Sequence, residues 1–189
     1  MAASNVQIAN RALQKLGAKR ISSLDQDHPN ARSMNAAFER VRRAELRRYP
    51  WSFAISRASI AADGDGPTWG DWNRYSLPDD FLRLIRDDET GTHVDWKIEG
   101  LYILSMDESP LEIRYIADVE DPNTFDSLFI EVFAGRLALE CCKEISDSTV
   151  DKESLKDDYM KDLAEAKKAG AIEKEAQEFM EDEWLAARR

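Results

Sequence analysis

Two histidines and two cysteines are the residues whose types could support catalysis or metal binding. His28 and His93 are the only histidines in the chain, and each lies next to a predicted turn. Neither has a serine, cysteine or carboxylate neighbour at the spacing of a known nucleophile or metal motif. Cys141 and Cys142 are adjacent, so a bridge between them is unfavourable, and two thiols alone make no metal site. We interpret the cysteines as small apolar residues of a buried helix.

Carboxylates are the other abundant reactive groups. Asp63, Asp65 and Asp71 are grouped in a glycine-rich loop, but the spacing and the terminal glutamate of an EF-hand are missing. The short, acidic segment Gly64-Asp65-Gly66 is unsuited to binding phosphate. A hydrolase with two catalytic carboxylates needs a groove and a defined separation, which sequence does not supply. We therefore expect no enzyme, no metal and no cofactor, with a carboxylate-based cell-wall hydrolase as an alternative.

The composition is that of a chain that can fold as one domain. It has 189 residues, 43% of them hydrophobic. No apolar run is long enough to span a bilayer. The segment Met1-Ala2-Ala3-Ser4-Asn5 lacks the basic and apolar regions of a secretory signal. We expect a protein made in the cytoplasm and kept there or packaged from it.

The charge is unevenly distributed along the chain. The net charge is -11, which argues against general affinity for nucleic acid. Residues 1–60 nevertheless hold 11 basic and 4 acidic residues, whereas the remainder holds 15 basic and 33 acidic residues. This asymmetry is either solvated surface or a device that orients self-association, with basic faces against acidic ones.

The elements that must position these residues follow from periodicity and from start and stop signals. Ser4 and Gln7 match a capping box, and Pro29 suits a first helical position. Helical spacing predicts four helices, and short alternating runs separated by turns predict antiparallel strands. We predict an α+β fold, mainly α: a helical bundle with a small antiparallel β domain and an extended, helix-prone C-terminal tail. The expected single domain covers residues 1–170 and the tail 171–189, with helices at about 4–17, 29–49, 126–146 and 151–169, and β structure at about 52–60 and 75–117.

The segment Tyr49-Pro50-Trp51-Ser52-Phe53-Ala54 marks the change from helix to sheet. Pro50 lacks a backbone N–H and disfavours α geometry at Tyr49, so the second helix should end there. Trp51, Phe53 and Ile55 then alternate as in a half-buried strand. We interpret Tyr49, Pro50, Trp51 and Phe53 as a structural hinge whose side chains pack in the core.

Three groups of residues are candidates for interaction. Basic residues on one face of the second helix are consistent with a nucleic-acid-associated regulatory module, but a solvated or subunit-facing surface is favoured. Tryptophans in the loop 61–73 either fold back onto the sheet or face a partner. Apolar residues in the acidic tail are typical of a segment that orders on binding. The groups are Arg40, Arg43 and Arg47; Trp69 and Trp72; and Phe179, Met180, Trp184, Leu185 and Arg188.

Taken in order, several segments resemble the head-to-tail adaptor family of short-tailed bacteriophages, of the tail tubular protein A type. No single motif is specific, and the ordered set is much more so. Arg48 before Tyr49-Pro50 and the acidic linker before Trp184 depart from the pattern. The segments are Ala9-Asn10-Arg11-Ala12-Leu13 with Leu16-Gly17 and Ile21-Ser22-Ser23-Leu24-Asp25; Leu46 with Tyr49 to Ala54; Tyr75-Ser76-Leu77-Pro78-Asp79-Asp80-Phe81-Leu82-Arg83; Arg114-Tyr115-Ile116, Phe125 and Leu137-Ala138; and Trp184-Leu185-Ala186-Ala187-Arg188.

The resemblance implies a structural and not a catalytic role. Such adaptors form a ring, commonly of twelve copies, beneath the portal protein of the virion. The ring extends the DNA channel, through which genomic DNA passes without sequence-specific binding, and provides the platform for the tail nozzle protein. The resemblance also implies that the C-terminal tail docks against the portal, that no cofactor is needed and that no membrane is involved.

Overall fold

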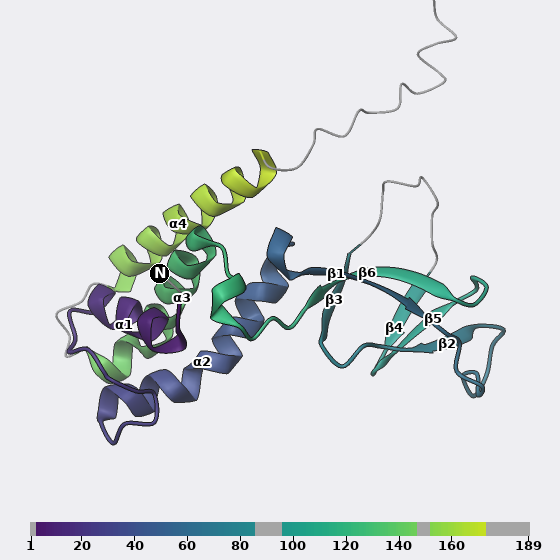
Figure 1. Ribbon diagram of the computed structural model, residues 1–189, viewed down its shortest axis with the longest axis horizontal. Coiled ribbons are helices and arrows are strands. Elements are labelled where there is room, and N and C mark those ends of the chain that lie inside the picture. Colours follow the sequence, from purple (N-terminus) through teal and green to yellow (C-terminus); the bar gives the residue numbers. More distant parts are fainter. Residues whose placement is uncertain (1–2, 86–95, 147–151, 173–189) are drawn as a thin grey trace, which may run out of the picture.

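The computed structural model describes residues 3–85, 96–146 and 152–172, which form a helical body and a β body joined end to end (Figure 1). The helical body contains α1 (Asn5–Lys15), α2 (Pro29–Arg48), α3 (Ser127–Ile145) and α4 (Lys152–Ile172). The β body contains β1 (Ile55–Ile60), β2 (Asn73–Ser76), β3 (Phe81–Ile85), β4 (Trp96–Glu99), β5 (Tyr102–Ser105) and β6 (Leu111–Ala117). Two short 3-10 helices, η1 (Ser52–Ala54) and η3 (Pro122–Thr124), lie where the chain passes between the bodies. The fold is α+β and mainly α, as predicted.

The helices begin and end at residues that the sequence marks. The capping box of α1 is present, because the Ser4 and Gln7 side chains each accept a hydrogen bond from the other's backbone N–H. After α1, Gly17 adopts a φ of 66°, a left-handed conformation that glycine adopts without strain. Pro29 is the first residue of α2, and the His28 imidazole caps that helix by accepting from the Asn30 N–H.

The core of the helical body lies where α3 is surrounded by the other helices. Phe129, Phe133 and Leu137 of α3 are fully buried, as expected for a helix that is apolar on most faces. The apolar stripes of α2 and α4 are buried against it. On α3, Gly135 faces α4, where a Cβ would make an ordinary van der Waals contact with Tyr159 at 3.6 Å. The buried stripes are Met34, Phe38 and Val41 on α2, and Leu155, Tyr159, Leu163 and Ala166 on α4.

The β body consists of two three-stranded antiparallel sheets that pack face to face. The inner sheet has the order β1-β6-β3 and lies next to the helical body, and the outer sheet has the order β2-β5-β4 (Figure 1). Tyr75 and Ile103 of the outer sheet and Ile113 and Tyr115 of the inner sheet form a second apolar core. This core is small, so the β body depends on its connection with the helices for its orientation.

The hinge, which we define as residues 49–54, differs from the prediction in one respect. Trp51, Phe53 and Ile55 alternate, but residues 52–54 form η1 and the first strand begins only at Ile55. The reason is packing: Trp51 and Phe53 both contact Phe129 of the helical body, with ring centroids 5.0 Å apart in each case. The aromatic side chains therefore belong to the helical core and not to the sheet.

None of the helices within the described ranges is both long and apolar enough to cross a membrane.

Candidate functional site: the hinge and the surfaces it joins

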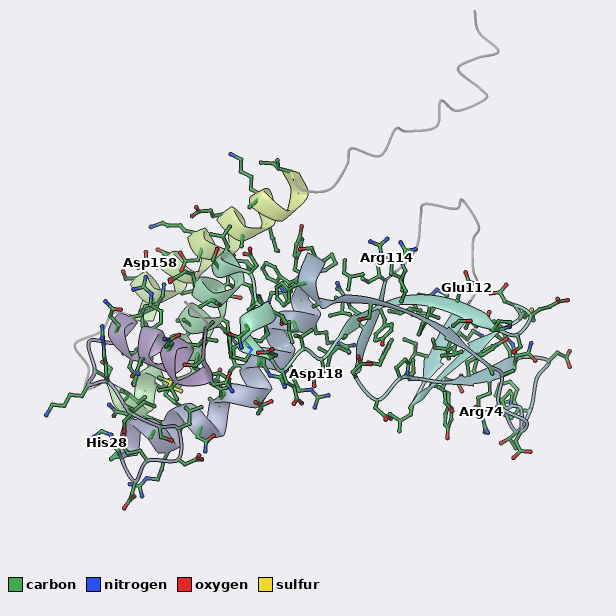
Figure 2. All side chains as sticks on the ribbon, in the orientation of Figure 1. His28, Arg74, Glu112, Arg114, Asp118 and Asp158 are labelled. Carbon is green, nitrogen blue, oxygen red and sulfur yellow. The ribbon has the colours of Figure 1, made fainter. Side chains whose placement is uncertain are left out.

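The junction between the two bodies is held by one buried arginine. The side chain of Arg42 on α2 is only 2% exposed. Its guanidinium donates to an Asp118 carboxylate oxygen at 2.7 Å, to the Val119 carbonyl oxygen and to the Glu39 carboxylate. Asp118 and Val119 follow β6, so this contact attaches the last strand of the inner sheet to α2. Figure 2 shows Asp118 at the point where the helical body meets the β body.

Two neighbours of Arg42 reinforce the same junction. The Nε of Arg43 lies 3.1 Å from the other carboxylate oxygen of Asp118. The guanidinium of Arg47 donates to the Leu82 carbonyl of β3. The backbone N–H of Asp118 in turn donates to the Asp80 carbonyl at 2.6 Å. Because a carboxylate and two carbonyls are held in this way, the orientation of the inner sheet on α2 is fixed.

The three arginines that sequence analysis assigned to a possible subunit interface thus have partners in their own chain. Besides Arg43 and Arg47, Arg40 donates to Glu140 of α3 at 2.7 Å. This hydrogen bond lowers the pKa of Glu140, outweighing the opposite effect of its partial burial. The arginines connect elements that are far apart in sequence, and their role in the described structure is to position those elements.

A second buried polar cluster lies inside the helical body. The Glu45 carboxylate is fully buried and accepts from the Tyr159 hydroxyl at 3.0 and 3.1 Å. The Nε atoms of Arg48 and Arg136 lie 3.4 and 3.8 Å from it. Burial raises the pKa of Glu45, although Arg48, the Tyr159 hydrogen bond and Arg136 act in the opposite direction. The buried carboxylate thus ties α2, α3 and α4 together.

The hinge aromatics cover this cluster. The Trp51 indole N–H donates to the Glu45 carbonyl at 3.0 Å, and the Trp51 ring contacts the rings of Tyr49 and Phe129. The Phe53 ring contacts Phe125 and Phe129 at 5.6 and 5.0 Å between centroids. Trp51 is 5% exposed. The prediction that the hinge residues are structural is consistent with these contacts.

A shallow hollow opens beside the hinge. We call it the hinge hollow. The enclosed part of the hollow measures only about 40 Å³, and the larger figure of about 410 Å³ counts the open space at its mouth as well. It is formed by three parts of the chain: the hinge itself, the start of α3 and the last turns of α4. Its lining residues are Tyr49, Pro50, Trp51, Ser52, Phe53, Asp126, Leu128, Ala166, Ala169 and Gly170.

The outer sheet is where large apolar side chains are exposed. Five of the seven exposed large apolar residues in the described ranges belong to this sheet or its flanking loops, so the β body offers more of them than the helical body does. Trp69 is the extreme case at 87% exposure. The five residues are Trp69, Ile98, Leu101, Tyr102 and Met106.

The two loop tryptophans differ in environment. Trp72 folds back onto the sheet, where the Lys97 ammonium lies 4.6 Å from its ring centroid. Trp69 projects into solvent. In the same sheet the Arg74 guanidinium lies 4.7 Å from the Tyr102 ring and donates to Asp63 at 3.0 Å. Figure 2 places Arg74 at the end of the β body remote from the helices.

The remaining residues considered for chemistry have structural environments where the structure describes them. His28 caps α2, and His93 lies outside the described residues. Cys141 and Cys142 are buried free thiols, and burial raises the pKa of Cys141 to about 11. Among the residues placed by the structure, no group of three or more His, Cys, Asp or Glu side chains could hold a metal ion. The tail candidates Phe179, Met180, Trp184, Leu185 and Arg188 all lie outside the described ranges.

Sequence reasoning missed three charged residues that make the main polar contacts of the junction and of the helical core. They are Arg42, Glu45 and Asp118. A signal was present for Glu45, which follows Val41 by four residues and so lies on the apolar stripe of α2. The partner of Arg42 is 76 residues away in sequence, and no local pattern indicates it.

A scan of protein-family models finds no match for this chain, and a search of curated proteins finds none either.

Proposed function

We propose that this protein is a structural head-to-tail adaptor of a short-tailed bacteriophage. Copies assemble as a ring beneath the portal protein, extend the channel for the DNA and form the platform on which the tail nozzle protein is built. The proposal places the mature protein in the virion, at the junction of head and tail. It assigns the protein no catalytic activity.

The observation that carries this proposal is the ordered set of segments that resemble the adaptor family. In the folded chain these segments meet one another. Asn10 of the first segment both donates to the Ile21 carbonyl and accepts from the Ile21 N–H, at 2.9 and 2.8 Å. The hinge aromatics contact Phe125, and the Asp80 carboxylate accepts from the Tyr115 hydroxyl at 2.9 Å. The residues that carry the resemblance therefore make structural contacts with one another. Such contacts support a family whose members share a fold.

The alternative of a nucleic-acid-associated module is less well supported. It requires the basic face of α2 to be available for phosphates. Arg43 and Arg47 contact the β body through Asp118 and the Leu82 carbonyl, and Arg40 contacts Glu140. The net charge of -11 adds a general repulsion of DNA. The same charge suits a conduit through which DNA slides without adhering.

Electron microscopy of the protein mixed with the portal protein of the same phage tests the proposal. We expect rings of the protein on one face of the portal, with nozzle protein recruited only when the ring is present. An isolated monomer in solution is compatible with the proposal, because assembly can await the portal. A protein that joins neither the portal nor the virion contradicts it.

A further inference from the structure

The strand β4 forms one edge of the outer sheet and is exposed along most of its length. The sheet has the order β2-β5-β4, so among the described residues β4 is paired on one side only, by β5. Lys97, Ile98 and Glu99 are all exposed, Ile98 at 42%, and the exposure continues to Leu101 at 75%. An edge of this kind presents backbone N–H and C=O groups with which another strand can pair.

The turn after β4 determines which backbone groups point to the free edge. Residues 100–101 form a two-residue turn, and Glu99 pairs with Tyr102 across it. In such a hairpin the residues that flank the turn exchange backbone hydrogen bonds, and bonded and non-bonded pairs then alternate along the strands. Glu99 and Lys97 therefore use their backbone groups within the hairpin. The N–H and C=O of Ile98, which lies between them, point to the free edge.

The sequence of β4 is complementary to an antiparallel copy of itself. When Ile98 lies opposite Ile98 of a second copy, the N–H and C=O of each residue meet those of the other and give two backbone hydrogen bonds. In this register Lys97 of each copy lies directly opposite Glu99 of the other. Opposite charges at directly opposed positions stabilise a strand pair, and here the match occurs twice.

Both charged groups of β4 are available for this contact. Within the described part of the chain, the Glu99 carboxylate takes part in no hydrogen bond or ion pair, and the Lys97 ammonium lies within ion-pair distance of no carboxylate. The ammonium lies 4.6 Å from the centroid of the Trp72 ring on the outward face of the sheet. Glu99 lies on the same face, because alternate residues of a strand share a face.

The other three edge strands of the two sheets lack this self-complementarity. β2 is continued on its outer side by a bridge between Ala62 and Tyr75, and β3 has a register shift after Phe81. β1 is regular along its whole length, but Arg57 is its only charged residue, so an antiparallel copy of β1 offers no opposite charge. Among the edges of the β body, β4 is therefore the one suited to pairing with its own copy.

We propose that two copies of this protein associate by antiparallel pairing of their β4 strands, which joins the two outer sheets into one six-stranded sheet. The strand is short, so the contact is weak, and its alternating charges disfavour pairing with unrelated strands. The contact is two-fold, so it joins two copies and cannot by itself build a ring. The inference is therefore independent of the proposed adaptor function, and its failure would leave that function untouched.

Sedimentation equilibrium of the full chain, without any partner protein, tests the proposal. We expect the wild type to pass from monomer to dimer with a midpoint at about 100 μM, because a small interface gives a low affinity. Lys97→Glu and Glu99→Lys should each abolish the dimer, since each places like charges opposite one another at both positions. A wild-type chain that stays monomeric up to about 1 mM overturns the proposal. A dimer that both variants retain overturns it too.

Recombining the charges separates strand pairing from a loss of structure in the variants. The double variant Lys97→Glu/Glu99→Lys has opposite charges in the same register, and so does a heterodimer formed in an equimolar mixture of the two single variants. We expect dimers in both samples. Lys156→Glu, at an exposed position of α4, is the control for the change in net charge and should dimerise like the wild type. The proposed register is wrong if either recombined sample stays monomeric or if the control loses its dimer.

Discussion

The helical body and the β body make opposite use of their polar and apolar groups. In the helical body, charged groups are turned inward and paired, as Arg42 is with Asp118 and Glu45 with Tyr159. In the β body, large apolar groups are turned outward on the outer sheet. Two tryptophans mark the contrast: Trp51 is 5% exposed and Trp69 is 87% exposed.

This difference separates the part of the molecule that sets its shape from the part that offers apolar contact. Buried charged pairs contribute little net stability compared with apolar packing, but each fixes the geometry of the groups it joins. An exposed indole gains nothing from the fold of its own chain. We therefore expect substitutions at the hinge to affect stability and substitutions on the outer sheet to affect association.

Trp51→Ala should destabilise the subunit by about 3–5 kcal/mol. The substitution leaves a cavity among Tyr49, Phe53 and Phe129 and removes the donor to the Glu45 carbonyl. Chemical denaturation followed by circular dichroism measures the free energy of unfolding. Trp51→Phe is the control and should lose less, because it keeps most of the ring contacts. An unchanged melting temperature of Trp51→Ala would place the indole at an interface instead.

Arg42→Met should cost roughly 3 kcal/mol, because it leaves Asp118 and Glu39 without the cation that they share. Arg43→Met is the matched control on the next residue of α2. It removes a salt bridge to the same Asp118 from a side chain that is 56% exposed, so we expect less than about 1 kcal/mol. Denaturant midpoints of the two variants give the comparison. Equal losses would mean that the burial of Arg42 has no bearing on the junction.

The second helix and the hinge show which features the sequence predicts and which it does not. The apolar stripe of α2 and the proline at the hinge are local patterns, so the helix was predicted at 29–49 and found at Pro29–Arg48. The partners of Arg40, Arg42 and Arg43 are set by tertiary contacts 75 to 100 residues away and leave no local trace. Trp51 and Phe53, which the sequence indicates as packing residues, both contact Phe129 of α3.

The strand was predicted to begin at about residue 52 but begins at Ile55, and this error has a physical cause. Alternation of apolar residues indicates which side chains are buried and not what they are buried against. A 3-10 turn also directs Trp51 and Phe53 toward one core, and here the helical core is the larger one. For the hinge hollow, three separate parts of the chain contribute walls, and no pattern in a single stretch predicts it.

Glu45→Gln should be neutral or stabilising near neutral pH, by up to about 1 kcal/mol. Burial raises the pKa of Glu45 above its ordinary value of 4.5, so the native state favours the protonated form. The cost of the charge is absent well below pH 4.5, builds up between pH 4.5 and the native pKa, and is complete above the native pKa. Glutamine keeps an acceptor for the Tyr159 hydroxyl and carries no charge.

The measurement for Glu45→Gln is the difference in unfolding free energy between variant and wild type across pH 4 to 8. We expect the advantage of the variant to grow with rising pH and then level off. The control, Glu140→Gln, should show the opposite trend, because Arg40 lowers the pKa of Glu140 and its stabilisation is lost on acidification. An advantage of Glu45→Gln that is largest at low pH contradicts the assignment.

Trp69→Ala should change the unfolding free energy by less than about 0.5 kcal/mol, the smallest effect in the series. Its indole is 87% exposed, so truncation removes almost no buried surface from the subunit. If the outer sheet is a contact surface, the same substitution should reduce incorporation into portal-bound rings or recruitment of the nozzle protein. Thr68→Ala, at an exposed neighbour, is the control for both measurements. Loss of assembly at constant stability is the result that only a contact residue gives. A fall in melting temperature comparable with that of Trp51→Ala would mean instead that the outer sheet, like the hinge, is held together by its tryptophan.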